Sequence, residues 1–431
     1  MYKKPTTIKE LCEFIWYLEE KYNLLDFETD GVKVWQYKRM EIYYKIAELS
    51  GVILQPHTRL KKIDKIKHLF VYIKNSFINN FFTLKRADTI VFSHPRVVDV
   101  DNKNIDIYTY YLINELKKKS NVIEFESANI GIHKKERTFY THYLDWVSLL
   151  QRFYKVFHKV SIIDRDLELL YKVKEEIDKV CSIDIKLIDI FRDNIKNYKS
   201  LYKIYDKIFK RVKPSICYTV NAYGQAPIIK ALKDNKILVV ELQHGVFSKY
   251  HLGYSFPNNK SNLEYFPDKL YVWSKFWKDL LKFPISNNNI VIDKFRYLEQ
   301  EKSKFIHLEK NQNQIIVLSQ GAIGDLIAQR FLDNYSMFKN YTVKYKLHPG
   351  EFDRWKNYTA LVKLSKYENI EIIKDEIPLY ELFAKSSIQV GVFSTALYEG
   401  IEFGCKTILF NISGIEYMDR FIEIRNDVDV I

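Results

Sequence analysis

Three short polar segments in the last third of the chain each follow an apolar run of strand length. They are Gln320-Gly321, His348-Pro349-Gly350 and Ser394-Thr395, and they come after the runs at residues 315–319, 343–347 and 388–392. In open parallel sheets, ligands bind just beyond the carboxyl ends of the strands. Glycine lets the backbone approach an anion closely, and the free amides of a helix start suit a phosphate. We therefore expect these segments to converge on one phosphate-bearing ligand.

Each of these segments also has an ordinary structural interpretation. A lone His348-Pro349 is typical of a surface turn, and Ser394 or Thr395 is a common helix cap. Glu399, about one turn into the following helix, could accept hydrogen bonds from ribose hydroxyls or simply be solvated. The occurrence of all three segments after strands of one series favours a nucleotide monophosphate or diphosphate as the ligand.

A further polar turn, ELQHG at residues 241–245, follows an apolar run in the first half of the chain. A histidine on a glycine turn at a strand end can act as a general base, although it can also merely cap a loop. We expect His244 to be the base, with Glu241, Asp99 and Asp101 as rivals. The aspartates follow the predicted strand at residues 89–93 and its His-Pro-Arg loop, so they could face a cleft and touch an acceptor.

Metal and cofactor signals are weak. The strings Asp99-Val-Asp101 and Asp164-Arg-Asp166 match the Asp-x-Asp pattern of metal-dependent transferases, but such strings are frequent by chance in a chain this charged. The four cysteines are far apart and form no Cys-x-x-Cys pair. The sequence also contains no Walker A string and no Gly-x-Ser-x-Gly elbow. We expect neither a metal nor another cofactor to be obligatory.

The elements that must position these residues alternate between strand and helix, which predicts an α/β protein with parallel sheets. A first series of strands is expected at residues 89–93, 122–126, 215–219, 237–242 and 270–273. A second is expected at residues 315–319, 343–347, 370–373, 388–392 and 407–410, with helices near 325–335, 379–386 and 396–403. The sequence thus predicts two Rossmann-like domains, at residues 86–293 and 315–431, joined by a polar linker at 294–314.

Two helical regions are expected outside this alternation. Residues 134–212 form a long, mostly helical insertion in the first domain, and residues 1–85 form a helical extension rich in aromatics. Within the extension, residues 66–82 interleave Lys and Asn with Phe, Ile and Leu. This amphipathic pattern suits either packing on its own domain, which is commoner, or an anionic bilayer.

Composition limits the class of protein. The chain has 431 residues, 47% of them hydrophobic, and a formal net charge of +13. That charge favours phosphorylated small molecules, anionic membranes or nucleic acid, and it is spread along the chain. The polar first ten residues lack the apolar core of a signal peptide. We expect a cytoplasmic protein, soluble or peripheral at the inner face of the plasma membrane.

The His348-Pro349 segment and the run from Ser394 to Gly400 together resemble bacterial GT-B glycosyltransferases of capsule and lipopolysaccharide assembly. The motifs are similar to those of sialyltransferases, Kdo transferases and CDP-glycerol glycerophosphotransferases. The resemblance implies that His348, Ser394 and Thr395 contact the donor phosphates. The region from residue 213 through the ELQHG turn to residue 254 resembles the Gln-His-Gly region of capsule-type transferases.

The sequence therefore predicts a GT-B protein with two doubly wound domains facing a central cleft. Its expected function is to move a sugar from a nucleotide-sugar donor to a glycan or lipid-linked acceptor of a bacterial surface polysaccharide. The donor would contact Gln320, Gly321 and Gly350 besides the motif residues. A UDP-sugar 2-epimerase of the same fold is one alternative, and a non-catalytic basic protein that binds membrane or nucleic acid is another. We expect no nucleic-acid partner, because no nucleic-acid motif is visible.

Overall fold

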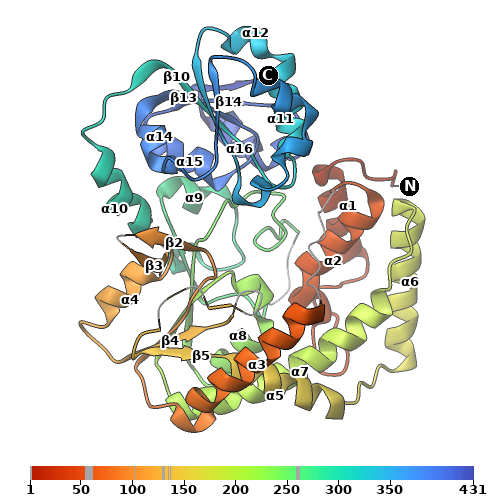
Figure 1. Ribbon diagram of the computed structural model, residues 1–431. Helices are drawn as coiled ribbons and strands as arrows, with labels where there is room; N and C mark the ends of the chain where they lie inside the picture. The colour runs from red at the N-terminus through yellow and green to blue at the C-terminus, as the bar shows by residue number, and fades with distance from the viewer. Residues whose placement is uncertain are drawn as a thin grey trace.

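Two sheets of parallel strands organise the chain, one in the upper half and one in the lower half of the molecule as seen in Figure 1. The computed structural model describes residues 2–53, 62–100, 102–128, 132, 133, 135, 137–258 and 263–431. For residues 62–68 it describes the backbone only. The lower sheet has the order β5-β4-β1-β6-β7-β8-β9, and the upper sheet has the order β12-β11-β10-β13-β14-β15. Every neighbouring pair of strands in both sheets is parallel.

In each sheet the chain forms a central strand first, adds strands out to one edge, and then returns to add strands on the other side. This is the doubly wound order of a Rossmann fold, in which the first and fourth strands lie side by side. Both of these strand pairs, β1 with β6 and β10 with β13, mark a topological switch point where the connections diverge and leave a crevice. The predicted α/β class with two Rossmann-like domains in a GT-B arrangement is confirmed.

The strands of the lower sheet are short and mostly buried, as expected for strands covered on both faces. They are β1 (Thr89–Phe92), β4 (Val122–Glu126), β5 (Thr141–Tyr143), β6 (Ile216–Val220), β7 (Leu238–Leu242), β8 (Lys269–Val272) and β9 (Ile290–Ile292). The helices of this half are α4 (Tyr110–Leu116), α5 (Asp145–Phe157), α6 (Asp164–Cys181), α7 (Leu187–Val212), α8 (Ala226–Asp234) and α9 (Lys275–Leu280). A hairpin, β2 (Val97–Val100) with β3 (Lys103–Asp106), projects from the loop after β1.

The upper sheet follows a helix, α10 (Arg296–Phe305), that occupies most of the segment expected as a linker. Its strands are β10 (Asn311–Leu318), β11 (Thr342–Lys346), β12 (Ile370–Ile373), β13 (Ser386–Gly391), β14 (Lys406–Leu409) and β15 (Val428–Val430). Its helices are α11 (Gly324–Asp333), α12 (Tyr335–Phe338), α13 (Thr359–Leu364), α14 (Leu379–Lys385), α15 (Thr395–Glu402) and α16 (Asp419–Ile424).

The first helices of the chain are part of the lower domain's core. These are α1 (Ile8–Lys21) and α2 (Val34–Ser50), and they share one apolar cluster with α6, α7 and the segment after β7. A buried ion pair of 2.6 Å joins Arg39 to Glu19, and Arg39 also donates to the carbonyl of Ser255 at 2.7 Å. Because a buried charge must be paired and hydrogen-bonded, this contact fixes the helices against the loop that follows ELQHG.

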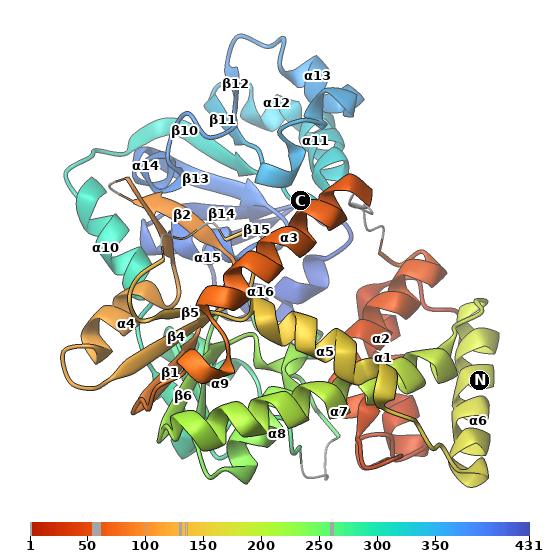
Figure 2. The same cartoon turned by 60° about the horizontal axis from the view of Figure 1, so that its bottom comes forward.

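The helix α3 (Lys62–Ile78) lies beside α5 at the surface of the lower domain (Figure 2). Asn75 on α3 donates to the carboxylate of Asp145 on α5 at 2.6 Å. The amphipathic pattern at residues 66–82 thus does form a packed helix, continued by the short 3-10 turn η1 (Phe81–Thr83). Within the part of the chain that the structure describes, no helix is both long and apolar enough to cross a bilayer.

Candidate functional site

The loops at the carboxyl ends of the two sheets come together between the domains. A Cβ placed on Gly245, in the turn after β7, would lie 3.6 Å from Oγ1 of Thr395, the first residue of α15. The turn of the lower sheet that contains His244 therefore touches the helix start of the upper sheet that was expected to hold a phosphate.

On the upper side, His348 follows β11 and is solvent-exposed. Its Nδ1 accepts the amide N–H of Gly350 at 3.1 Å, which places the proton of the neutral ring on Nε2, where it can donate to an anion. Partial burial lowers the pKa of His348, and the charges of Arg96 and Arg354 lower it further. Of these two cations, Arg96 belongs to the opposite domain.

A fully buried carboxyl fixes the loop that carries His348. Glu351 accepts the backbone N–H of His348 and the hydroxyl of Ser319, both at 2.9 Å. A Cβ on Gly324, the first residue of α11, would fall 1.6 Å from Oε1 of Glu351. Glycine is therefore required at that helix start because the carboxylate fills the space, and the predicted glycine turn serves this packing.

Two predicted donor contacts, Gly321 and Gln320, lie in the loop after β10. A Cβ on Gly321 would approach Nδ1 of His348 to 3.0 Å, so a larger residue there would push the imidazole away by a few tenths of an ångström. The Gln320 side chain bridges to the backbone of Phe393: its oxygen accepts the N–H at 3.2 Å, and its amide donates to the carbonyl. Gln320 thus holds the loops after β10 and β13 together, and its contact with a donor stays a prediction.

The start of α15 has the geometry of a capped helix. Ser394 is the N-cap in an extended conformation, and its Oγ accepts the N–H of Ala396 at 3.2 Å. Thr395 is the first helical residue, and its side chain lies at the domain contact with Gly245. The first amides of a helix carry partial positive charge and have no partner within the helix, which suits an anion.

Glu399 lies farther along the same helix and is only 2% exposed. Neither of its carboxylate oxygens has a hydrogen-bond partner within the described parts of the chain. Burial raises the pKa of Glu399, whereas the charge of Arg96 and the hydroxyl of Tyr380 oppose that increase. Glu399 is therefore a buried carboxyl near Arg96, and its predicted contact with a ribose stays a prediction.

On the lower side, the loop after β1 carries His94, Pro95 and Arg96 toward the domain contact. Asp106, which is fully buried, accepts the N–H of His94 at 2.7 Å and the N–H of Tyr108 at 2.9 Å, so it fixes the loop. Arg96 donates to the hydroxyl of Tyr108 at 3.0 Å, and that hydroxyl donates to the carbonyl of His244 at 2.6 Å. Arg96 is thus a cation supplied by the lower domain near His348.

His244 and Glu241 belong to one buried chain of hydrogen bonds. The Tyr254 hydroxyl donates to Oε1 of Glu241 at 2.5 Å and lies 3.4 Å from Nδ1 of His244. Burial raises the pKa of Glu241 to about 7, and its Oε2 has no partner among the described residues. Burial, followed by the charges of His251, His94 and Arg96, lowers the pKa of His244 to about 3. The imidazole is therefore neutral near pH 7.

The other predicted bases are less well placed. Asp99 is exposed on the hairpin β2–β3, where its carboxylate accepts the N–H of Asn102 at 3.2 Å and so stabilises the turn. Asp101 lies outside the described residues. The structure thus brings His244 and Glu241 to the domain contact, together with His348, Ser394 and Thr395 from the other domain.

Sequence reasoning did not single out four residues that the structure places at this site. Arg96 follows β1, so the same strand-end rule that selected His348 could have found it. Glu351 adjoins His348 in the sequence, but its role depends on a contact with Ser319, 32 residues away. Tyr108 and Tyr254 carry no sequence signal, because only the fold brings their hydroxyls to His244.

No family model matches this chain, and no curated protein matches it. Several solved structures resemble it weakly. One is a UDP-GlcNAc 2-epimerase from Methanocaldococcus jannaschii, with 10% identity, 80% of this chain and 88% of that chain covered, and a TM-score of 0.46. Another is a glycosyltransferase from Rickettsia africae, with 16% identity, coverages of 80% and 84%, and a TM-score of 0.37.

A third is the glycotransferase of kitacinnamycin, with 8% identity, coverages of 81% and 87%, and a TM-score of 0.43. Similarities at this level say nothing about the reaction of this chain. The assignment of two Rossmann-like domains rests on the strand orders of its own two sheets, and their facing loops are shown by the contact between Gly245 and Thr395.

Proposed function

We propose that this protein is a glycosyltransferase that uses a nucleotide-sugar donor. The observation that carries the proposal is the contact between the turn of His244 and the start of α15 across the domains, with Arg96 of the lower domain near enough to His348 to lower its pKa. A guanidinium, an imidazole N–H and free helix amides together match the charge and the acceptor oxygens of a phosphate leaving group. Both halves of the molecule supply part of this set, so a bound diphosphate would connect them.

The neutral imidazole of His244 supplies the other half of the chemistry. The acceptor hydroxyl would give its proton to His244 as its oxygen bonds to the anomeric carbon. The bond from that carbon to the donor phosphate breaks, and its electrons stay on the phosphate oxygen. Glu241, once ionised, would stabilise the imidazolium through the hydroxyl of Tyr254. Stabilisation of the leaving phosphate by fixed donors would supply much of the catalysis.

The acceptor in this proposal is a glycan or lipid-linked glycan of a bacterial capsule or lipopolysaccharide. The protein would work in the cytoplasm, peripherally associated with the inner face of the plasma membrane. We also propose that no metal is obligatory, because Arg96, His348 and the helix amides can neutralise the leaving group. Transfer measured with and without a chelator tests that point, and a chelator-sensitive rate restored by Mg²⁺ would contradict it.

A nucleotide panel tests the donor site directly. A ligand that binds only the native state raises the melting temperature, so one of CMP, CDP, UDP or GDP should stabilise the protein. His348→Ala should abolish most of that shift, whereas His307→Ala, which alters an exposed histidine beyond α10, should leave it unchanged. If no nucleotide stabilises the wild-type protein and His348→Ala changes nothing in any transfer assay, the proposal is wrong.

A sugar-nucleotide 2-epimerase is the second candidate. The pairing of neutral His244 with Glu241, whose pKa lies near 7, would also suit proton transfer at a sugar carbon. An epimerase needs no acceptor, so sugar-nucleotide turnover without one discriminates the two reactions. A new epimeric donor formed without acceptor would support the epimerase, and product that appears only with an acceptor would support the transferase.

A further inference from the structure

One face of the lower domain leaves an unusual number of aromatic side chains in solvent. Each of the six phenylalanines exposed in the described part of the chain belongs to it, and they come from α3, η1, α5 and the segment before β5. Three of these side chains are almost completely exposed: Phe77 at 81%, Phe82 at 82% and Phe139 at 94%. The others are Phe70, Phe153 and Phe157.

The elements that carry these side chains are neighbours in the fold. The bond from Asn75 to Asp145 fixes α3 along α5, and the two helices lie side by side in Figure 2. Ile78, at the end of α3, and Phe139 line the same cavity. We call this surface, from α5 across α3 to that cavity, the aromatic face. Large exposed apolar patches on a protein surface mark sites of interaction.

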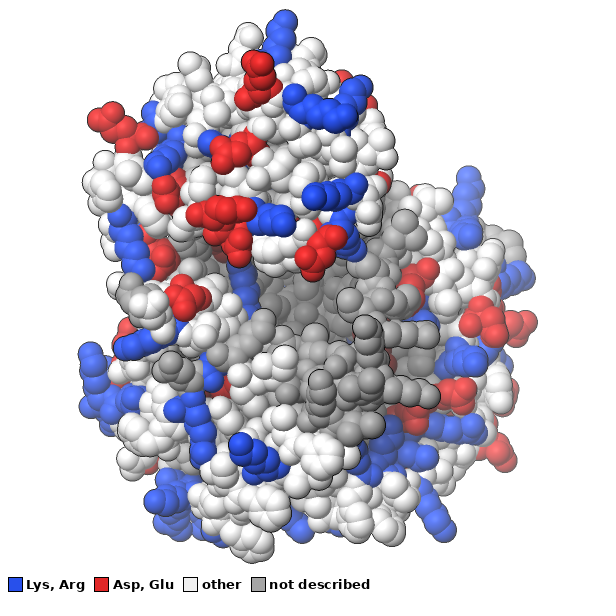
Figure 3. Space-filling model, in the orientation of Figure 1, with Lys and Arg blue, Asp and Glu red and all other residues white. Residues whose placement is uncertain are grey.

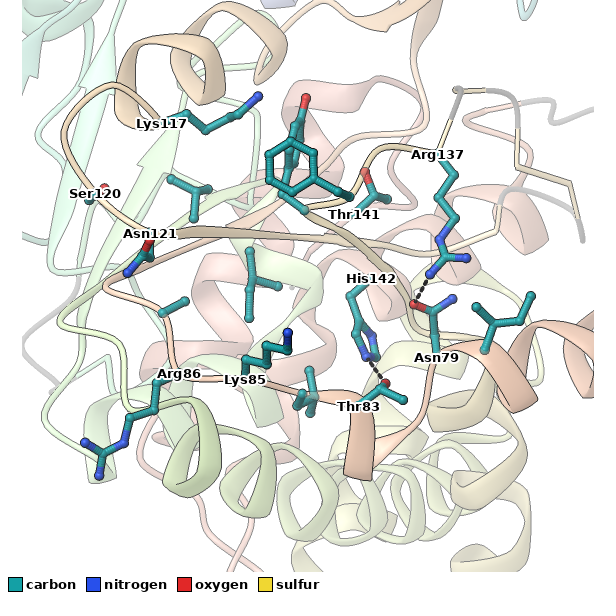
Figure 4. Close-up of a pocket in the computed structure, with 17 residues that line it drawn as sticks. Asn79, Thr83, Lys85, Arg86, Lys117, Ser120, Asn121, Arg137, Thr141 and His142 are labelled. Carbon is teal, nitrogen blue, oxygen red and sulfur yellow. Dashed lines mark hydrogen bonds between the residues drawn. The ribbon is translucent and has the colours of Figure 1, made fainter.

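The cavity at the edge of the aromatic face is strongly basic. It has a volume of about 550 Å³, and Lys85, Arg86, Lys117 and Arg137 line it (Figure 4). No carboxylate occurs among its described lining residues. Figure 4 shows Lys85 extending toward the middle of the cavity, whereas Arg86 points outward. The four cations have no ion-pair partner within the described residues, so their charge is available to an anion from outside.

The cavity lies at the opposite edge of the sheet from the candidate catalytic site. Ala87, Asn121 and Val122 line it, and they stand at the amino ends of β1 and β4. His244 and Arg96 follow the carboxyl ends of strands in the same sheet. An anion bound in this cavity is therefore not the reacting donor, and the cavity needs a separate explanation.

Charge and apolar surface occur together on this face. Lys74 on α3 and Arg152 and Lys155 on α5 stand among the exposed phenylalanines. Figure 3 shows red and blue side chains interspersed over the upper domain, whereas blue side chains surround white surface in the lower part of the lower domain. A helix pair with aromatic side chains outward and cations beside them matches the interface of a bilayer that carries anionic lipid.

We propose that the aromatic face docks on an anionic phospholipid bilayer and that the basic cavity receives a lipid phosphate. Phe77, Phe82 and Phe139 enter the acyl boundary, while the four cavity cations contact head groups. The proposal rests on the peripheral association included in the proposed function and names the surface that makes it. It does not depend on the transfer chemistry.

Binding of the full chain to sedimented vesicles tests the proposal in the absence of nucleotide. Vesicles of phosphatidylcholine mixed with phosphatidylglycerol should bind the protein at least tenfold more tightly than phosphatidylcholine alone. Phe77→Ser combined with Phe139→Ser should reduce binding to the mixed vesicles at least tenfold. Each cation removed by Lys85→Gln or Lys117→Gln should reduce it roughly fivefold at low salt.

The control is a pair of exposed apolar side chains away from the aromatic face, one after α10 and one on α11. Ile306 is 82% exposed and Leu326 is 50% exposed, and Ile306→Ser with Leu326→Ser should leave vesicle binding unchanged. The melting temperature of each variant, and its shift by nucleotide, should match the wild type, which shows that the fold and the donor site are intact.

Four results would overturn the proposal. The first is equal binding of the wild type to neutral and anionic vesicles, and the second is full binding by the phenylalanine variant. The third is binding of inorganic phosphate to the cavity without any vesicle binding, which would make the cavity a free-anion site. Self-association that the phenylalanine variant abolishes, again without vesicle binding, would show a second copy to be the occupant. Failure here leaves the nucleotide panel untouched, so the two proposals fail separately.

Discussion

The two Rossmann-like halves share a strand order but differ in what lies at the carboxyl edges of their sheets. The upper half presents backbone amides, close glycines and an exposed imidazole; of its buried carboxyls, Glu351 fixes a loop and Glu399 lies within α15. The lower half places buried titratable groups at the same edge, including Asp106, Glu241 and His244. One half is thus built to hold an anion, and the other is built to move a proton.

The sharpest test of this contrast is His244→Ala in the lower half. Loss of a general base lowers a rate by about 10² to 10⁴, so kcat should fall by that factor. The melting shift caused by nucleotide should persist, because the phosphate contacts come mainly from the upper half. Steady-state kinetics and thermal shift on the same preparation check both points. If the variant lost nucleotide binding as well as rate, the proposed separation of anion binding and proton transfer between the two halves would be wrong.

A second test concerns the buried charges of the lower half. His133 donates to Glu126 at 2.9 Å and to Asp145 at 3.1 Å, and its side chain is 7% exposed. Although burial opposes the charged ring, the bonds and charges of Asp145 and Glu126 raise the pKa of His133 to about 9. A raised histidine pKa stabilises the fold fully below the pKa of the unfolded chain, near 6.5, and this contribution is lost as the pH rises through 9.

His133→Ala should therefore cost roughly 3 kcal/mol of unfolding free energy at pH 6 and clearly less at pH 9.5. Urea unfolding of the wild type and the variant at both pH values measures the difference. His307→Ala serves as the exposed control and should cost nothing measurable at either pH. A penalty that does not change with pH would mean that His133 contributes packing alone.

A third test uses the pH dependence of the rate. Burial raises the pKa of Glu241 to about 7, so the ionised form that can stabilise an imidazolium is lost as the pH falls below 7. We expect kcat/KM to rise about tenfold between pH 6 and pH 8 in the wild type, and Glu241→Gln should remove that rise.

The carboxyl of Glu241 also binds its proton more tightly in the native state than in the unfolded chain. Its stabilising effect is therefore present at low pH and declines as the pH rises toward 7.

The smallest expected effect belongs to the upper half. Ser394→Ala removes the cap of α15 and should cost about 1 kcal/mol of stability, while Ser394→Gly should cost less. Because the phosphate would be held by backbone amides, Ser394→Ala should weaken nucleotide binding only a few-fold. Calorimetric titration with the nucleotide chosen by the panel measures that change. A hundredfold loss would show that the hydroxyl itself binds the phosphate.

The sequence predicted the regular parts of the fold because their signals are local. All ten strands expected from apolar runs occur within a few residues of their predicted positions. The edge strands β5, β9 and β15 were not predicted, because each has only three residues and shows no period. The hairpin β2–β3 was also missed, since most of residues 97–106 are polar or charged.

The candidate site was predictable to the extent that its residues follow strands. His348, Ser394 and His244 lie at strand ends, and the strand-end rule finds such residues from the sequence alone. The partners that define their chemistry come from elsewhere in the chain: Tyr254 reaches His244 from a later loop, and Arg96 reaches His348 from another domain. Burial also cannot be read from residue type, and it alone separates Glu241, with a pKa near 7, from an ordinary surface glutamate.

The hydroxyl of Tyr108 links the binding of the donor to the position of the base. Tyr108 accepts from Arg96 with the same hydroxyl that donates to the loop of His244. A donor phosphate that draws Arg96 toward itself would change the hydrogen bond that holds the base. Two-substrate kinetics should then show a compulsory order, in which the nucleotide sugar enters first and the acceptor hydroxyl meets a base already set in place.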